Sequence, residues 1–537
     1  MKTKTKESRI ILSILQLLII LICCSESLTG QVYKESMKYG QFLHFLDKYY
    51  VDSINTEIMV EDAIKYQLKQ LDPHSTYISA SDVQKMNESL LGNFEGIGIS
   101  FNILHDTLFV INPTPNGPSE KVGIIAGDRI VQVNSENIAG IGLTNDDVFS
   151  LLRGPKDTEV RVVVKRRAVD KLLEFTIVRD KIPITSIDAA YVVEEGIGYI
   201  KLNRFSQTTM DEFVMAGTSL KKNGVHNLIL DLTGNTGGYL EMAVALADQF
   251  LDDDKLIVYT EGLHSERREY LAANPGLFEQ GKIIILIDEE SASASEIVSG
   301  AIQDWDRGII IGRRSFGKGL VQRQLELPDG SMIRLTTAKY YTPTGRLIQK
   351  PYDDGLEEYQ NEIFKRYQHG EFIHSDSISF PDSLQYETLL SKRIVFGGGG
   401  IMPDIFIPLD TTAYSGYERE IIRQGILNQF VLQYVDKNRK KLKSTYKNVI
   451  ELKNKFVVTS DLLIELDNYA SEIGLKTKPD GIDDSDSDLI TLFKAYIARD
   501  LFSTSEFYEI INQNDKNVQK AIDVLKNWKL YGEKVIF

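Results

Sequence analysis

Cysteine is almost absent from this sequence, and histidine is scarce. The only two cysteines, Cys23 and Cys24, are adjacent near the N-terminus, so the rest of the chain can form no disulfide, thiolate metal site or cysteine nucleophile. The seven histidines show neither an HExxH pair nor short metal-ligand spacing, which argues against a zinc hydrolase. We expect neither a metal nor a cofactor.

An excess of positive charge is also missing. Lys and Arg number 61 against 76 Asp and Glu, which gives a net charge of −15. Such an acidic surface disfavours nucleic acid or an anionic bilayer face as partner. The 537 residues are 42% hydrophobic, which is enough to bury several cores, so about three or four domains are expected.

Residues 1–30 have the pattern of a targeting segment. Four basic residues precede the 15-residue apolar run Ile10–Cys24, and the polar Ser25-Glu26-Ser27 follows it. A spanning helix needs about 20 apolar residues, so the pattern favours a secretory signal peptide. Three outcomes stay open, in this order: cleavage, lipidation at Cys23 or Cys24, and an uncleaved membrane anchor. Each places the body of the protein outside the cytoplasm, with membrane association only through this segment or a lipid.

The hydrophobic period changes along the chain. Residues 31–92 carry apolar side chains at helical spacing and predict a small helical domain. Residues 93–182 predict five or six short strands. One helix, Val148 to Leu152, is expected among them after the capping box Thr144-Asn145-Asp146-Asp147. This second segment should form a compact β-rich module.

Strands and helices alternate from Gly196 to about Pro343. This alternation predicts an α/β layer structure with functional positions on the turns at strand ends. We assign this core to residues 183–352 and 396–410. The charged residues 353–395 between them are predicted to be an insertion or linker, and the four glycines 397–400 a hinge. Residues 411–537 are predicted to form a C-terminal helical extension, so the whole chain is an α/β multidomain protein.

Three serines lie where a buried strand ends and a helix begins. Ser291, Ser293 and Ser295 follow the apolar strand Ile283–Ile287. At a helix start a hydroxyl meets unpaired N–H groups and the positive end of the helix dipole, which can stabilise an oxyanion. The same position suits an ordinary N-cap serine. A nucleophilic serine also needs a base, and no histidine lies in a recognisable partner motif.

Lys318 is the candidate base. Its neighbours Gly317 and Gly319 allow another backbone to pack closely, which excludes water and favours the neutral amine. In an extended strand Lys318 and Gln322 lie on one face, where the Gln322 amide could orient the amine. The alternative interpretation is a surface lysine in a glycine-containing turn.

A glycine pair follows another predicted strand, in the sequence Asp231 to Gly238. Gly237 and Gly238 expose backbone N–H groups, so this loop is a second possible oxyanion donor. It imitates the Gly-Asn-Ser-Gly-Gly of trypsin-like proteases. However, Thr236 occupies the serine position and no histidine and aspartate motifs precede it.

The β-rich module, residues 93–182, resembles a PDZ domain. The resemblance rests on the strand and helix order, on Ala126 to Ile130, and on the start of the first strand, Gly96, Ile97, Gly98 and Ile99. It implies that a peptide adds as a strand to an open sheet edge while the N–H groups of the glycine-rich loop hold its terminal carboxylate. A side chain there would block the anion.

Together these motifs resemble the C-terminal processing peptidases, or tail-specific proteases, which are secreted serine proteases with a PDZ domain beside a Ser/Lys core. The ordered matches run from Leu71–Ile78, through the loops above, to Ala338–Arg346 and Gly400–Asp404. Two positions depart from the family pattern. Thr233 stands where arginine is usual and Thr236 where proline or serine is usual, so the anchoring of that loop is expected to differ.

The resemblance implies a role for each candidate residue. Ser293 becomes the nucleophile, Lys318 the general base and Gln322 the residue that orients the lysine. The oxyanion hole becomes the backbone N–H of Ala294 with that of Gly237 or Gly238.

The implied function is a serine endopeptidase that binds the C-terminal segments of protein or peptide substrates and cleaves them through an acyl-enzyme. It would act in the periplasm or cell envelope of a bacterium, and the linkers at residues 179–185 and around Gly92 would be hinges for PDZ movement. The alternative is a PDZ scaffold that binds peptides without turnover. A dyad of Ser295 with Lys318 is a lesser alternative.

Overall fold

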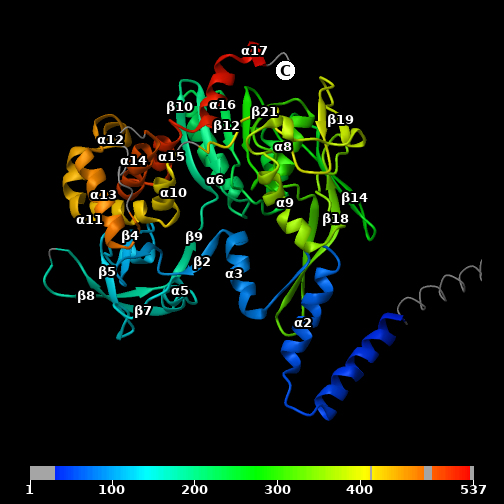
Figure 1. The fold of residues 1–537 in the computed structure, drawn as a ribbon, viewed down its shortest axis with the longest axis horizontal. Coiled ribbons are helices and arrows are strands. Elements are labelled where there is room, and N and C mark those ends of the chain that lie inside the picture. The colour runs from blue at the N-terminus through cyan, green and yellow to red at the C-terminus, as the bar shows by residue number, and fades with distance from the viewer. Residues whose placement is uncertain (1–30, 168, 412–413, 477–486, 532–537) are drawn as a thin grey trace, which may run out of the picture. The chain divides into compact units, whose positions relative to one another are not determined.

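The computed structural model describes residues 31–167, 169–411, 414–476 and 487–531 (Figure 1). The predicted targeting segment therefore lies outside the described residues. None of the described helices combines the length and apolarity that a bilayer crossing requires. The chain divides into two compact units, residues 1–77 and 78–537. The first contains a helix over residues 31–49 and α2 (Thr56–Lys69), where the Asn55 side chain accepts the Ile58 N–H at the helix start.

The β-rich module is built on one antiparallel sheet. Its order is β3 (Ile99–Ile103), β4 (Leu108–Pro113), β5 (Arg129–Val133), β7 (Glu159–Lys165) and β8 (Leu173–Val178). The module also contains α5 (Asn145–Leu152), and the predicted capping box of Thr144 and Asp147 is confirmed at its start. Val148 and Leu152 of this helix belong to the same buried apolar cluster as strand residues such as Val162. Because β3 is an edge strand, it can accept an added strand.

The two connections of this module to the rest of the chain pair with each other. β2 (Asn93–Gly96) enters the module and β9 (Asp180–Pro183) leaves it, and the two strands run antiparallel. The predicted hinges thus form a two-stranded ribbon. Whether this ribbon bends stays a prediction.

The core contains a six-stranded sheet at its centre. The order is β10 (Ile187–Glu194), β11 (Ile197–Leu202), β12 (Asn227–Asp231), β15 (Ile283–Ile287), β16 (Ile309–Gly312) and β21 (Ile405–Phe406). All neighbouring pairs are parallel except β10 with β11. A parallel sheet is buried on both faces, which explains the uninterrupted apolar run of β15.

Helices cover both faces of this sheet. One face packs with α6 (Thr209–Lys222), α7 (Leu240–Asp248) and α8 (Ala294–Asp304). The opposite face packs with α16 (Lys516–Lys526), whose Val518, Ala521 and Leu525 share a cluster with Ile229 and Ile284 (Figure 1). The range predicted as one C-terminal extension therefore supplies a layer of this α/β core.

The remaining C-terminal helices form a bundle with its own core. They are α10 (Gly416–Arg423), α11 (Ile426–Thr445), α12 (Val449–Lys455), α13 (Ser460–Glu472), α14 (Ser487–Leu501) and α15 (Thr504–Ile511). Buried side chains from several of these helices, including Phe430, Leu466 and Phe493, form one apolar cluster. The bundle thus has its own core between β21 and α16, but its last helix also packs on the edge strand β10, where the Tyr191 hydroxyl donates to Tyr508 O.

A second sheet carries the loop with the candidate base. Its strands include the hairpin β17 (Leu320–Glu326) and β18 (Met332–Tyr341), then β13 (Leu256–Gly262) and β14 (Ser265–Leu271). The β17–β18 pairing is antiparallel, with a register shift between Val321 and Gln322. Such a bulge changes which side chains share a face.

The charged segment 353–395 is folded rather than a simple linker. It contains α9 (Leu356–Gln368) and the short pair β19 (Gln385–Glu387) and β20 (Ile394–Phe396). The glycines that follow pack tightly: the N–H of Gly400 donates to Ile348 O at 2.8 Å, and a Cβ on Gly400 would lie 2.6 Å from Ser315 O. These glycines serve close backbone packing, not the predicted hinge.

Candidate active site

Ser293 has the conformation of an exposed nucleophile on a sharp turn. It precedes α8 with φ 55° and ψ −112°, a region that costs a non-glycine residue about 1–3 kcal/mol and is found mainly at functional sites. Ser293 is partly exposed, whereas Ser291 and Ser295 are completely buried. The order of strand, strained turn and helix around Ser293 is one that exposes a serine hydroxyl at the end of a sheet.

The two neighbouring serines hold the glycine loop instead. The Ser291 hydroxyl donates to Leu232 O and the Ser295 hydroxyl to Asn235 O, each at 2.9 Å. The N–H of Ala292 also donates to Asn235 O, at 3.0 Å. These bonds pin residues 231–238 against the start of α8. They also commit the Ser295 hydroxyl to a structural role, which disfavours Ser295 as the nucleophile.

Backbone contacts fix the Lys318 loop from both sides. The carbonyl of Gly317 accepts the Lys350 N–H at 2.9 Å, and the N–H of Gly319 donates to Gln349 Oε1 at 2.8 Å. Another backbone passes close to both glycines, as the sequence predicts, because a Cβ on Gly317 or Gly319 would lie 3.0 or 2.9 Å from a backbone nitrogen. The position of Lys318 therefore depends on close packing that only glycine permits.

Glu296 joins the loops that carry Ser293 and Lys318. Its Oε2 accepts the backbone N–H of Ser293 at 2.7 Å and of Lys318 at 2.9 Å. Its Oε1 accepts the Gly317 N–H at 2.7 Å and the Ser315 hydroxyl at 2.6 Å. Burial raises the pKa of this carboxyl to about 7, although the hydrogen bonds oppose the shift.

Tyr340 on β18 joins the same two residues through their carbonyl groups. Its hydroxyl lies 2.6 Å from Lys318 O and 3.1 Å from Ser293 O. The ring is buried, and burial raises the pKa of the Tyr340 hydroxyl well above its usual value, so the hydroxyl stays a donor. Ser293 and Lys318 are thus bridged twice, once through their N–H groups and once through their carbonyls.

The predicted role of Gln322 stays a prediction. Its amide donates to Leu320 O and Thr336 Oγ1, each at 3.4 Å. The sequence argument assumed one continuous strand from Lys318 to Gln322, but Lys318 precedes β17 and the register shifts at Val321. The simple alternation of side chains therefore does not apply across this interval.

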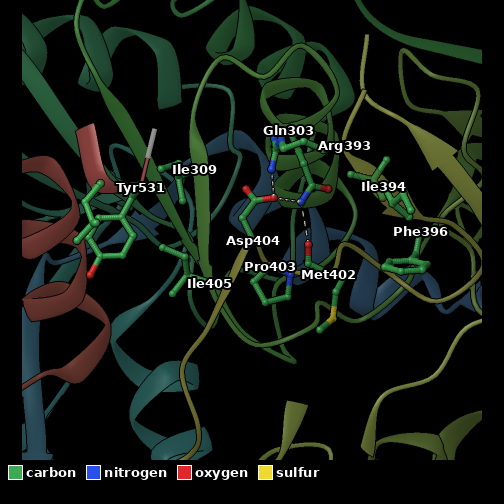
Figure 2. Close-up of a pocket in the computed structure, with 12 residues that line it drawn as sticks. Gln303, Ile309, Arg393, Ile394, Phe396, Met402, Pro403, Asp404, Ile405 and Tyr531 are labelled. Carbon is green, nitrogen blue, oxygen red and sulfur yellow. Dashed lines mark hydrogen bonds and ion pairs between the residues drawn. The ribbon is translucent and has the colours of Figure 1, made fainter. Parts of the chain in front are cut away.

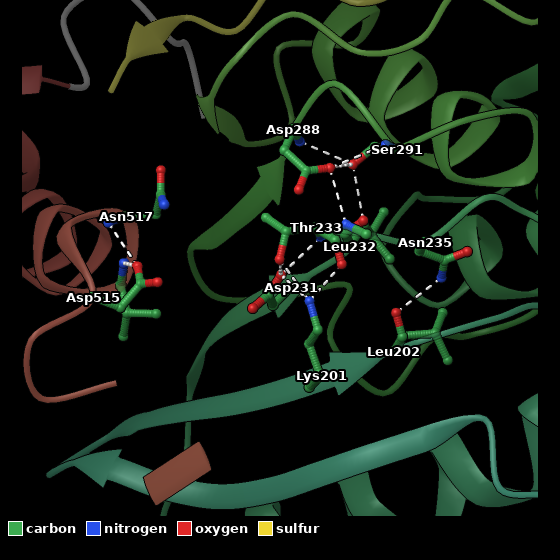
Figure 3. Close-up of polar contacts among 12 residues, drawn as sticks. Lys201, Leu202, Asp231, Leu232, Thr233, Asn235, Asp288, Ser291, Asp515 and Asn517 are labelled. Atoms are coloured by element: carbon green, nitrogen blue, oxygen red, sulfur yellow. Dashed lines mark hydrogen bonds and ion pairs between the residues drawn. The ribbon is translucent and has the colours of Figure 1, made fainter. Parts of the chain in front are cut away.

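The loop of residues 231–238 lies against Ser293. Figure 3 shows its contacts with Ser291. A Cβ on Gly237 would lie 2.8 Å from Ser293 Cβ, and one on Gly238 only 2.0 Å from Phe205 O. The N–H of Gly237 already donates to Asn235 Oδ1 at 2.9 Å. In the described part of the chain, the N–H groups of Ala294 and Gly238 donate to no protein acceptor. Of the predicted oxyanion donors, these two are the ones available to a ligand.

Lys201 anchors this loop, and the sequence analysis missed it. Its ammonium bonds Asp231 Oδ1 at 2.9 Å, and both the carbonyl and hydroxyl oxygens of Thr233 at 2.6 Å (Figure 3). The Lys201 and Asp231 side chains are each 8% exposed. A cation from β11 thus binds directly to Thr233, where the family usually has arginine. The available signal was a lysine within the apolar strand Ile197–Leu202.

The predicted peptide-binding residues lie where β2 gives way to β3. Gly96 ends β2 and Ile99 begins β3. Gly98 has φ +70°, and a Cβ there would lie 2.9 Å from the Ile182 side chain. The Ile97 carbonyl accepts both the N–H and the hydroxyl of Ser119. These contacts order the loop at one end of β3. Phe101 of β3 and Phe149 of α5 face each other with ring centroids 5.7 Å apart.

A cavity of about 660 Å³ lies apart from these residues (Figure 2). Its wall includes Gln303 and Arg393, both of which bond Asp404, together with apolar side chains such as Ile309 and Phe396. None of the sequence-predicted site residues lines it. The candidate active site therefore rests on the two bridged loops and not on this cavity.

Comparison with known families supports the sequence analysis. Peptidase family S41 matches residues 196–357, and the PDZ domain matches residues 109–166. A family of unknown function matches residues 417–503, within the helical bundle. Both the peptidase core and the PDZ module predicted from the sequence are thereby confirmed.

Individual relatives carry matching names. A carboxy-terminal-processing protease of Bartonella bacilliformis is 34% identical over 337 residues, which cover 61% of this chain and 77% of that protein. The carboxy-terminal processing protease CtpA of Bacillus subtilis is 32% identical over 302 residues, which cover 56% of this chain and 64% of that protein. The solved photosystem II D1 C-terminal processing protease is 26% identical, with 69% of this chain and 86% of that chain covered and a TM-score of 0.36.

Proposed function

Because this chain belongs to the carboxy-terminal processing peptidases of family S41, which are serine-type peptidases, we propose that Ser293 and Lys318 are its catalytic dyad. One observation carries the proposal: Glu296 and Tyr340 each bond both residues through the backbone. This double bridge brings a strained, accessible serine next to a lysine in closely packed surroundings. Gln322 is proposed to orient the lysine amine.

The proposed reaction proceeds through an acyl-enzyme. Neutral Lys318 takes the Ser293 hydroxyl proton as Oγ attacks a peptide carbonyl. The resulting oxyanion accepts hydrogen bonds from the N–H groups of Ala294 and Gly238. Lys318 then gives the proton to the leaving amine, which breaks the C–N bond. A water activated by the same amine hydrolyses the ester and restores Ser293.

The PDZ domain is proposed to deliver the substrate. A C-terminal segment would add as a strand along the open edge of β3, with its carboxylate at the Gly96–Ile99 loop. Phe101 and Phe149, which border this edge, would contact its side chains. The substrates would then be proteins or peptides recognised by their C-terminal residues and cleaved upstream of them.

We also propose that the protein is exported and acts in the bacterial cell envelope. The support is the sequence alone: a basic start, a 15-residue apolar run and a polar flank within residues 1–30. N-terminal sequencing and mass measurement of the protein isolated from cell fractions test this. An intact, unmodified N-terminus in the cytoplasmic fraction would contradict export.

The dyad is tested by covalent labelling and turnover together. A fluorophosphonate should label the wild-type protein at Ser293, and both the Ser293→Ala and Lys318→Ala variants should lose labelling and cleavage. A peptide with a hydrophobic C-terminus should still bind each variant. Binding without labelling or turnover in the wild type would instead support the PDZ scaffold. Labelling at Ser295 would overturn the assignment of the nucleophile.

A further inference from the structure

Arg334 on β18 is a half-buried cation without an acidic partner among the described residues. Its guanidinium contacts the thioether of Met86, and burial lowers the pKa of that guanidinium. Four buried arginines of the core pair with carboxylates: Arg313 with Glu289, Arg314 with Glu371, Arg346 with Asp304 and Arg393 with Asp306. A fifth, Arg307, donates to three backbone carbonyls instead. Arg334 has neither kind of oxygen partner among the described residues, and a partly desolvated charge without one is costly.

The hairpin places Arg334 on the same face as Gln322. The Gln322 amide contacts the Thr336 hydroxyl across the two strands. Two positions further along each strand, Gln324 lies directly opposite Arg334, with no register shift in between. Because residues two apart in a strand share a face, these four residues form one continuous surface, which we call the polar strip.

The polar strip leads away from the proposed dyad. Tyr340, which contacts the carbonyls of Ser293 and Lys318, lies six positions from Arg334 on β18. Six residues of strand span about 20 Å, so an extended substrate lying beside the hairpin would need about six residues to cover this distance. The far end of the strip contacts Met86 of α3 (Ala80–Leu91), which directly precedes β2 and the PDZ domain.

We propose that Arg334 is a specificity-determining residue that binds an acidic side chain of the substrate. The inference rests on the proposed function, in which the PDZ domain holds the C-terminus of the substrate. The substrate segment between the dyad and the PDZ domain then lies C-terminal to the scissile bond. An Asp or Glu about six residues C-terminal to that bond would reach Arg334. Gln324 would bond the substrate backbone along the way.

The chemistry of Arg334 fits a carboxylate. A guanidinium offers two parallel N–H donors that match the two oxygens of a carboxylate. Partial burial protects such a pair from salt screening. The chain as a whole carries a net charge of −15 and repels acidic segments in general, so preference for an acid at one position requires a local cation.

Paired peptides test this inference. All peptides of the series share one hydrophobic C-terminus. Each carries a single Glu, or a Gln in its place, at one of the successive positions C-terminal to the scissile bond. The wild type should show a kcat/KM about 10- to 100-fold higher for Glu than for Gln at one position, mainly through KM. Arg334→Gln should remove that preference, and Arg334→Lys should retain part of it. The control Arg323→Gln, an exposed arginine one position along β17 from Gln322, should keep the full preference.

Several readouts separate this inference from the proposed function. Circular dichroism and thermal unfolding of Arg334→Gln should match the wild type, which shows that the variant is folded. Fluorescence anisotropy with Ser293→Ala protein measures the Glu preference in binding alone, so it tests Arg334 even if the dyad assignment fails. A wild type without Glu preference at any position, or an unchanged preference in Arg334→Gln, overturns the inference.

Discussion

The backbone N–H groups of Ser293 and Lys318 donate to one and the same atom, Oε2 of Glu296, at 2.7 and 2.9 Å. A shared acceptor fixes the separation of two loops that are 25 positions apart in the sequence. Geometry of this kind matters because misplacing a catalytic group by about 1 Å can cost about 100-fold in rate. In the proposed mechanism this completely buried carboxylate is a positioning group for the two residues.

Removal of either proposed catalytic side chain should abolish cleavage while the fold persists. Ser293→Ala and Lys318→Ala are each expected to lower kcat by about 10⁴-fold or more, since the members of such a unit act together. Thermal unfolding should be nearly unchanged, because Ser293 is partly exposed and strained. A matched control is Ser299→Ala on the same helix, where the hydroxyl only donates to Ser295 O. Substantial turnover by either dyad variant would refute the assignment.

Glu296→Gln should lower kcat by about 100-fold with a small change in KM. The wild-type carboxylate accepts hydrogen bonds from N–H groups of both loops. The glutamine amide would point its own N–H group at one of these donors, and the two loops would shift apart. Steady-state kinetics with a short peptide measure the effect. Circular dichroism establishes that the variant is folded. Wild-type kcat in this variant would mean that the double bridge does not position the dyad.

Titration of Glu296 should make activity rise and stability fall as the pH increases. Burial raises the pKa of the folded carboxyl to about 7, above its ordinary value of 4.5, so the folded state prefers the protonated form. Stability from this group is therefore complete below about pH 4.5 and is lost as the pH rises through about 7. Activity should instead fall below about pH 7, where protonation removes an acceptor. Parallel pH series of kcat and thermal midpoint check this, and Glu296→Gln should flatten the stability series.

Lys201→Met should destabilise the core and displace the loop of residues 231–238. Removing one partner of a buried ion pair costs about 3–5 kcal/mol, because Asp231 stays buried and charged. The thermal midpoint should drop, and kcat should fall because Thr233 loses its anchor. Lys222→Met, at an exposed position of α6, is the matched control and should change neither quantity. An unaltered midpoint in Lys201→Met would show that the pair contributes little.

Phe149→Glu should weaken recognition of C-terminal tails without affecting the dyad. Phe149 is 39% exposed and faces Phe101 beside the open edge of β3, so a carboxylate there would repel a bound C-terminus. We expect kcat/KM to fall about 10-fold or more for long tailed substrates and to stay constant for short peptides. Val178→Glu, at the opposite edge of the same sheet and 48% exposed, is the control. An equal loss for both substrate lengths would argue against delivery by the PDZ domain.

Regular elements with a strong local pattern were predictable from the sequence. The strand Ile283–Ile287 is uniformly apolar and occurs at the predicted bounds, and the helix that contains Val148 to Leu152 begins at the predicted capping box. By contrast, β14 is a charged edge strand and α9 is a polar helix. β14 lacks the alternation that a half-buried strand usually has. α9 does carry apolar residues at helical spacing, at Leu356, Tyr359, Ile363 and Tyr367, but the charged composition of residues 353–395 favoured a linker. The position of β14 depends on tertiary contacts that the local sequence does not encode.

The sequence indicated candidate site residues, whose roles stay a prediction, but it did not indicate the contacts that hold them. The motif around Ser293 and Lys318 pointed to a dyad, yet the positive φ of Ser293 and the shared oxygen of Glu296 arise only when distant loops meet. Glu296 reads in the sequence as an ordinary helix-start acid. Likewise, the commitment of the Gly237 N–H to Asn235 changes which oxyanion donors are available, and this depends on one side-chain rotamer.

The return of α16 to the catalytic sheet has a practical consequence for the helical bundle. The chain enters the bundle from β21 and leaves it into α16, and both of these elements belong to the peptidase core. A C-terminal truncation that stops short of Lys516 would expose Ile229, Ile284 and Leu286 to water and would report on misfolding rather than on the bundle. The contribution of the other bundle helices is accessible by internal excision with a linker from Asp410 to Ser503, which keeps α15 on β10 and α16 on the sheet.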